Sequence, residues 1–264
     1  MTSPVPEDDR LPQRLRAQAV IREGEAEIGR SWFRALQRFL DRVRPSVRSG
    51  GGVDPSRVSD HADFWTDQVN VEIVPTIGRT LGRVYRRIRG REPERDPFVA
   101  DYLNRAGNRL VRLPDEIYAL IVMAVEEGIR RGQGMDDIAA AVDEILTATA
   151  SERWPNRART VARTETMGAV NAGVYRSAVL TARDGGELAP MKLWLATEDN
   201  RTRRTHRDAD GQRTLLESPF RVGGADLLFP GDPNGPAEEV INCRCTMLPV
   251  VLGEEIDWTD RQDP

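Results

Sequence analysis

The longest regular feature of the sequence is a run of apolar residues at helical spacing near the N-terminus. Its members, which follow one another in steps of one, three or four positions, are Ile28, Trp32, Leu36, Phe39, Leu40 and Val43. This spacing places them in a single stripe and predicts a long amphipathic helix over residues 13–44, ended by Pro45. A stripe of this length must be covered by other helices, so the chain is expected to build a helical body.

Further helical segments follow along the chain. Asp54-Pro55 predicts a helix start, because a proline in the first turn loses no hydrogen bond, and Pro75 is expected to interrupt or kink the helix after it. Residues 90–97 have the composition of a charged linker. Helices are then predicted over residues 97–111, 115–131, 136–150 and 156–182. The central region is therefore expected to be an all-helical bundle.

The periodicity changes after Asp184-Gly185-Gly186. The apolar run Met191–Ala196 is typical of a short strand. Similar short runs follow at residues 213–216, 227–229 and 245–252. We therefore predict an α+β fold, with a mostly helical N-terminal and central bundle of long amphipathic helices followed by a small C-terminal β-containing domain with long loops.

Composition shifts divide the chain into five predicted parts. The start is acidic and rich in proline, and the last residues are strongly acidic. The parts are a disordered N-terminus (1–12), a helical N-terminal region (13–96), a helical bundle (97–186), a small β-containing module (187–252) and an acidic tail (253–264).

Charge and hydropathy restrict the class of protein. The sequence has no apolar run of about 18 residues, so no membrane partner is expected. Its N-terminus lacks the basic start and apolar run of a signal peptide, which predicts synthesis in the cytoplasm. The net charge of -4 argues against nucleic acid bound over the whole surface.

Arginines nevertheless gather in one region. They are Arg79, Arg83, Arg86, Arg87, Arg89 and Arg91. We call these six residues the arginine cluster. They fall on and beside the polar face of a predicted helix, and they could contact DNA phosphates or an acidic partner, or simply form a solvated face.

The stretch from Leu195 to Leu248 collects the rare side chains of the chain. It holds one of two histidines, His206, and the only two cysteines, Cys243 and Cys245. These three could bind zinc, with Asp199, Asp208 or Asp210 as a fourth ligand. The favoured interpretation needs no cofactor: the cysteines are reduced strand residues, and His206 orders a loop through hydrogen bonds.

A cysteine beside His206 could also act as a nucleophile. No nucleophile elbow or phosphate-binding loop accompanies the pair, so neither an enzyme nor a small-molecule substrate is expected. Arg163 and Glu165 are two apart on a helix and face different ways. One or both are predicted to brace the loop around Asp199 and Arg201 by ion pairing.

The motifs of the C-terminal half resemble one known family. They are Ala162-Arg163-Thr164-Glu165-Thr166, the strand of Trp194, Asp199 with Arg201-Thr202, His206 with Asp210-Gly211, Pro230-Gly231-Asp232-Pro233 and Asn242-Cys243-Arg244-Cys245. In this order and spacing, over roughly residues 115–250, they resemble the phage Mu F-like minor head proteins, also described as phage head morphogenesis proteins. We therefore predict a structural clasp, an interlocked set of side chains made of Arg163, Glu165, Trp194, Asp199, Arg201, His206, Asn242, Cys243 and Cys245.

The resemblance implies a structural component of a tailed-phage or prophage head, synthesised in the host cytoplasm and located in the virion, in the head interior or at the portal vertex. Portal protein and major capsid protein are the implied partners, with phage DNA through the arginine cluster. The implied roles are head morphogenesis and DNA packaging or ejection. Family members often carry a cysteine where this chain has Arg203. The alternative is a metal-dependent or thiol hydrolase of nucleic acid or protein, acting through His206, Cys243 and Cys245.

Overall fold

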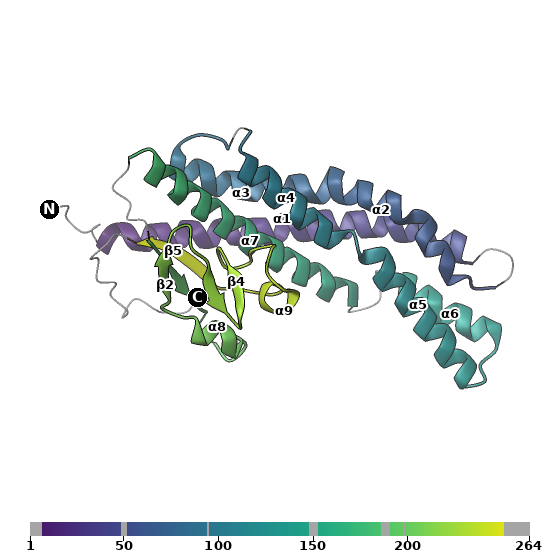
Figure 1. Cartoon of the computed structure of the whole chain (residues 1–264). Helices are drawn as coiled ribbons and strands as arrows, with labels where there is room; N and C mark the ends of the chain where they lie inside the picture. The colour runs from purple at the N-terminus through teal and green to yellow at the C-terminus, as the bar shows by residue number, and fades with distance from the viewer. Residues whose placement is uncertain are drawn as a thin grey trace.

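A computed structural model describes residues 7–48, 52–93, 95–147, 153–185, 191–197 and 199–250. Its body is built on three long helices that lie side by side (Figure 1). These are α1 (Glu7–Val47), α3 (Val74–Arg89) and α7 (Arg153–Arg183). The predicted α+β class is confirmed, with helices dominating.

Helix α1 is longer than predicted at both ends. It begins at Glu7, so residues 7–12, predicted as disordered, are helical. It also continues past Pro45 to Val47, because a proline removes only one backbone donor near a helix end. The predicted acidic tail lies outside the described residues.

Residues 55–73, which lead directly into α3, are helical in three different forms. Asp54 caps the 3-10 helix η2 (Pro55–His61) by accepting a hydrogen bond of 3.0 Å from the Ser56 backbone N–H. Helix α2 (Ala62–Gln68) and the π-helical turn η3 (Val69–Ile73) follow. In this turn the Val74 N–H reaches back to the Val69 carbonyl, and the wider turn lets the rod continue through Pro75.

The predicted central helices are confirmed with small shifts at their ends. They are α4 (Pro97–Leu110), α5 (Leu113–Arg130) and α6 (Met135–Leu146). Helices α5 and α6 form a hairpin at one end of the body (Figure 1). Within the described ranges, no helix is both long and apolar enough to cross a membrane.

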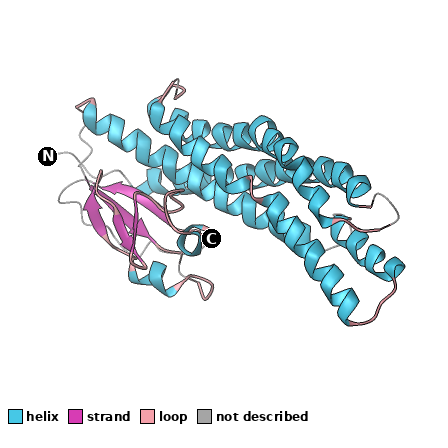
Figure 2. Ribbon diagram, turned by 45° about the vertical axis from the view of Figure 1, so that its right-hand side comes forward, coloured by secondary structure: helices cyan, strands magenta, loops and turns pink. Residues whose placement is uncertain are grey.

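The C-terminal strands lie together against one side of the helical body (Figure 2). Strand β1 (Met191–Leu195) is the centre of an antiparallel sheet with the order β2-β1-β5, in which Trp194 faces Met247. Its neighbours in the sheet are β2 (Arg213–Leu215) and β5 (Thr246–Val250). A separate hairpin is formed by β3 (Phe220–Val222) and β4 (Ala225–Leu227). Two short helices, α8 (Arg204–Asp208) and α9 (Ala237–Val240), complete this region. Strand β3 was not predicted, and the strand predicted over residues 227–229 lies at 225–227 instead.

One continuous hydrophobic core joins the helices to the strands. Phe229 follows β4 and packs against aromatic rings of two helices, with ring centroids 5.5 Å from Tyr175 of α7 and 6.2 and 6.3 Å from Phe98 and Tyr102 of α4. Such aromatic pairs add stability beyond the area they bury. The C-terminal strands are therefore seated on the helical body through a packed interior.

Candidate functional site

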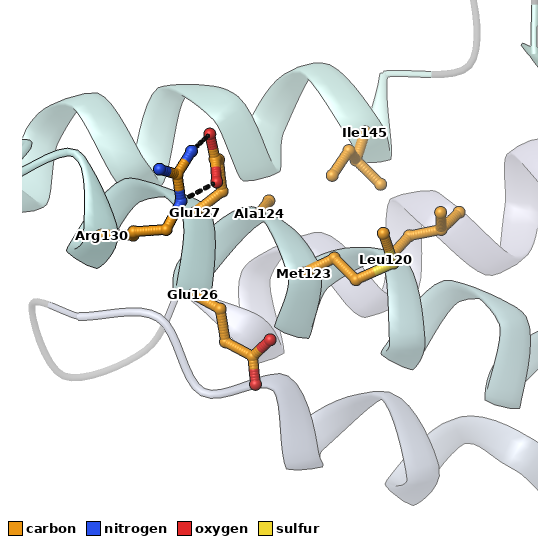
Figure 3. Close-up of a pocket in the computed structure, with 7 residues that line it drawn as sticks. All are labelled: Leu120, Met123, Ala124, Glu126, Glu127, Arg130 and Ile145. Carbon is orange, nitrogen blue, oxygen red and sulfur yellow. Dashed lines mark hydrogen bonds and ion pairs between the residues drawn. The ribbon is translucent and has the colours of Figure 1, made fainter.

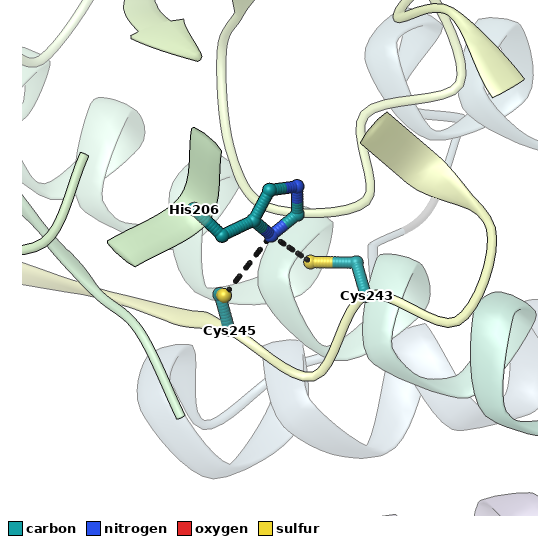
Figure 4. A group of neighbouring side chains, drawn as sticks. All are labelled: His206, Cys243 and Cys245. Atoms are coloured by element: carbon teal, nitrogen blue, oxygen red, sulfur yellow. Dashed lines mark hydrogen bonds between the residues drawn. The ribbon is translucent and has the colours of Figure 1, made fainter. Parts of the chain in front are cut away.

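His206 lies at the centre of the cluster that the rare residues of the sequence indicated. Its ring is buried, and its Nδ1 is 3.3 Å from the Cys245 Sγ and 3.7 Å from the Cys243 Sγ (Figure 4). On the opposite side of the ring, Nε2 is 2.9 Å from Glu239 Oε2. The structure thus brings together all three predicted candidates and adds a carboxylate.

Two local features place the cysteines beside the histidine. Asn242 has a φ of 59°, a left-handed conformation that asparagine tolerates, and the chain turns there before the Cys243–Cys245 segment. The Asn242 backbone N–H donates a hydrogen bond of 2.9 Å to Thr164 Oγ1 on α7. Trp194 of β1 packs edge-on against the His206 ring, with centroids 5.5 Å apart. The segment is therefore held by a helix on one side and a strand on the other.

Glu239 was missed by sequence reasoning. Its carboxylate accepts a hydrogen bond of 2.8 Å from Thr205 Oγ1 in addition to its contact with His206. The space around it requires a glycine, since a Cβ on Gly223, whose φ is 58°, would lie 2.1 Å from Glu239 Oε1. The contact joins residues 33 positions apart, and nothing in the sequence distinguishes this glutamate from Glu238, the other acidic residue of α9.

The two cysteines differ in acidity. A hydrogen bond from Cys243 and the contact with His206 lower the pKa of the Cys245 thiol to about 5, against the effect of burial. The same sulfur–sulfur contact, together with burial, raises the pKa of Cys243 well above its usual range. Cys245 is therefore the more acidic thiol of the pair.

The three aspartates predicted as a fourth metal ligand have other partners. Asp199 forms a two-pronged ion pair with the Arg244 guanidinium, which holds the pKa of that carboxyl well below its usual range. Asp210 Oδ1 accepts a hydrogen bond of 2.9 Å from the Ala196 N–H. Asp208 faces Arg204 at 3.7 Å on the exposed side of α8. These carboxylates organise loops around the cluster.

Part of the predicted clasp needs correction. Glu165 is buried and pairs with Arg109 of α4 at 2.9 and 3.0 Å, while Arg163 points to Glu25 of α1 at 3.8 Å. Neither braces the loop of Asp199, because the two positions lie on faces of α7 that are covered by other helices. Arg201 contacts Asp199 within the loop itself, at 3.4 Å between the guanidinium and the carboxylate.

Asn171 is a second buried residue that sequence reasoning did not assign to the site. From α7, its Nδ2 donates to the carbonyl oxygens of Pro230 and Cys245, both at 3.0 Å, and its Oδ1 accepts from the Met247 N–H at 3.2 Å. A single side chain therefore satisfies three backbone groups of the C-terminal module.

Lys192, the sole lysine of the sequence, is also buried. Its Nζ donates to the Leu228 carbonyl at 2.6 Å and lies 4.9 Å from the ring centroids of both Tyr175 and Phe220. Burial lowers the pKa of the ammonium to about 8, although the charge of Asp232 opposes this. The aromatic faces and the carbonyl compensate part of the cost of burying the cation.

The arginine cluster is divided between exposed and engaged side chains. Arg83 pairs with Glu27 of α1, and Arg89 pairs with Asp184 and donates a hydrogen bond of 2.9 Å to Thr181 of α7. The remaining members are exposed: Arg79, which donates to Thr76 at 2.8 Å, Arg86, which pairs with Glu92, and Arg87 and Arg91. DNA contact by this surface stays a prediction.

A separate groove of about 550 Å³ lies between α5 and α6 (Figure 3). It is lined by Leu120, Met123, Ala124, Glu126, Glu127, Arg130 and Ile145. None of these residues was predicted as a site residue. Glu127 on its rim pairs with Arg130 at 2.6 Å and with Arg131 at 2.5 Å.

Comparison with known proteins finds one family that part of this chain resembles. Residues 119–248, just under half of the chain, match the family described as Phage Mu protein F like protein. No solved structure matches the chain closely.

Three curated proteins are similar to parts of the chain. NAD(+)--arginine ADP-ribosyltransferase EFV of Enterococcus faecalis is 32% identical over 155 residues, which cover 56% of this chain and 29% of that protein. Minor head protein GP7 of Bacillus phage SPP1 is 31% identical over 140 residues, 53% of this chain and 42% of that protein. Uncharacterized protein YqbB of Bacillus subtilis is 31% identical over 99 residues, 36% of this chain and 31% of that protein. The chain therefore spans less than half the length of each relative.

Proposed function

We propose that this chain, whose residues 119–248 match the family described as Phage Mu protein F like protein, is a structural minor head protein of a tailed phage or prophage. The observation that carries the proposal is a pair of sequence likenesses that both point to phage head proteins. The family match covers residues 119–248, which include α6, α7 and most of the C-terminal module, and a protein named as a minor head protein is 31% identical over 140 residues.

The burial of the candidate site supports a structural role. His206 and Cys245 are each 1% exposed, and their polar atoms are occupied by neighbours within the module. Buried polar networks of this kind fix one arrangement of loops. The module would thus present a rigid surface to other head components, while the long helices α1, α3 and α7 would carry it.

The finer role we propose is at the portal vertex, in head morphogenesis and in DNA packaging or ejection. The partners would be the portal protein and the major capsid protein. DNA would be reached through the exposed arginines of the cluster, since guanidinium groups bind phosphates well.

Quantitative mass spectrometry of purified particles, combined with crosslinking to the portal, tests this proposal. We expect the protein in a few copies per particle, with crosslinks to portal and capsid proteins. Particles that lack it, or crosslinks confined to tail proteins, would contradict the proposal. Deletion of its gene is expected to reduce the yield of DNA-filled heads.

A thiol hydrolase is the second candidate, favoured by the row Cys245, His206 and Glu239. In cysteine hydrolases a nucleophilic thiol lies beside a histidine base, and a third polar group orients that histidine. Here Cys245 would be the nucleophile, His206 the base and Glu239 the group that orients it. Because the Cys245 sulfur is buried, a substrate reaches it only if the covering segments move. Rapid labelling of Cys245 in the folded protein by a small alkylating reagent would favour the hydrolase, and slow labelling would favour the structural role.

A further inference from the structure

Three potential metal ligands converge in the buried cluster. The His206 Nδ1 and the sulfur atoms of Cys243 and Cys245 lie within 4.8 Å of one another. Zinc binds sulfur at about 2.3 Å and nitrogen at about 2.0–2.1 Å in tetrahedral geometry, which places the nitrogen and each sulfur about 3.6 Å apart. The observed distances, 3.3 and 3.7 Å, lie on either side of this value.

Hydrogen bonds alone explain the two sulfur contacts of the His206 Nδ1 less completely than a bound metal ion does. One ring nitrogen has either one hydrogen or one lone pair, and it therefore makes one good hydrogen bond. Here two sulfur atoms face the same Nδ1, and Figure 4 shows them approaching it from different directions. A cation between the three atoms would satisfy both sulfurs and the nitrogen together.

Glu239 sets the orientation that a metal-binding histidine needs. Its Oε2 lies 2.9 Å from Nε2, so a neutral ring that donates its Nε2 hydrogen to this carboxylate keeps its lone pair at Nδ1, toward the sulfurs. The carboxylate is itself held by the Thr205 hydroxyl at 2.8 Å. A carboxylate behind the histidine is the usual support of a zinc ligand.

The chemistry of the ligand set selects the metal. Two thiolates and an imidazole suit zinc, whereas magnesium and calcium prefer oxygen ligands. We propose that His206, Cys243 and Cys245 bind one zinc ion, with Glu239 as the positioning residue and a water molecule as the fourth ligand. The ion would join α8 to the segment before β5 and so fasten loops that few strands support.

Metal analysis of the full-length protein tests the proposal. Protein purified from zinc-supplemented cells and dialysed without chelator is expected to hold about one zinc ion per chain. Cys243→Ser, Cys245→Ser and His206→Ala should reduce zinc to background. His61→Ala is the matched control, since this other histidine contacts Ser46 at 2.8 Å, away from the cluster, and it should leave the zinc content unchanged.

Two measurements keep the test decisive where a ligand variant fails to fold. Cobalt(II) exchanged into the wild-type protein should give a thiolate-to-cobalt charge-transfer band and the visible bands of a tetrahedral ion. Glu239→Gln should bind zinc about 10–100-fold more weakly in competition with a chelator, while still reaching one ion at saturating zinc. Folded wild-type protein without zinc and without the charge-transfer band overturns the proposal, as do cysteine variants that retain zinc.

Discussion

The Asn171 side chain on α7 donates a hydrogen bond of 3.0 Å to the carbonyl oxygen of Cys245, at the entrance to β5. The same amide serves Pro230 and Met247, so three backbone groups of the C-terminal module depend on one buried polar residue of the helical body. This relationship gives the first of five predictions.

Asn171→Ala should lower the free energy of unfolding by about 3 kcal/mol, because it leaves three buried backbone groups without partners. Urea denaturation measures the change. Asn108→Ala, on the exposed face of α4, is the control and should alter stability by a few tenths of a kcal/mol. Equal effects of the two substitutions would show that the Asn171 contacts do not stabilise the module.

Glu165→Ala should destabilise the protein by about 3–5 kcal/mol, since it leaves the Arg109 guanidinium without its counter-charge in the interior. The matched substitution is Glu127→Ala, which removes an exposed partner of Arg130 and should cost at most about 1 kcal/mol. Thermal and urea unfolding of both variants provide the comparison. A small loss in Glu165→Ala would mean that water replaces the carboxylate.

Lys192 should make the protein more stable as the pH rises from about 8 to 10. The folded protein releases this proton near pH 8, whereas the unfolded chain holds it up to about 10.5, so the unfolded state binds the extra proton between these values. The gain is at most about 3 kcal/mol. Lys192→Met should abolish this rise, which urea midpoints at several pH values would reveal; an unchanged slope would exclude Lys192 as its cause.

Asp199 should contribute to stability above about pH 4 and lose this contribution in acid. Its pKa lies well below the ordinary 3.8 because of Arg244, so on acidification the unfolded chain takes up the proton first. Asp199→Asn should therefore show a flatter decline of stability between about pH 4 and 2.5. Asp226→Asn, which breaks the exposed ion pair with Arg221, serves as the control and should keep the wild-type slope.

The exposed arginines of the cluster should carry any binding to DNA. Arg79→Gln with Arg86→Gln is expected to weaken retention of double-stranded DNA and to reduce the slope of log affinity against log salt by about 0.9 per lost phosphate contact. Arg204→Gln on α8 is an equally exposed control. Binding that does not depend on salt, or a control variant that weakens it as much, would remove the arginine cluster from the proposed function.

Local patterns explain why most of the helical body could be predicted. The stripe of Trp32, Leu36 and Phe39 marks one face of α1, and Asp54-Pro55 marks the start of η2, because the signals for both lie within a few residues. The rarity of histidine and cysteine in this sequence was enough to single out His206, Cys243 and Cys245.

The partners of those residues depended on the tertiary structure. Glu239 and Arg109 belong to charged types that make up 30% of the chain, and Asn171 is one polar residue among many on α7, so their spacing carries no signal. Their contacts span 33, 56 and 74 residues. The sequence by itself determined the helices and singled out the histidine and the two cysteines, because periodicity and scarcity can be read without the fold. Only the packing of α7 against the C-terminal strands decided which charges and amides meet.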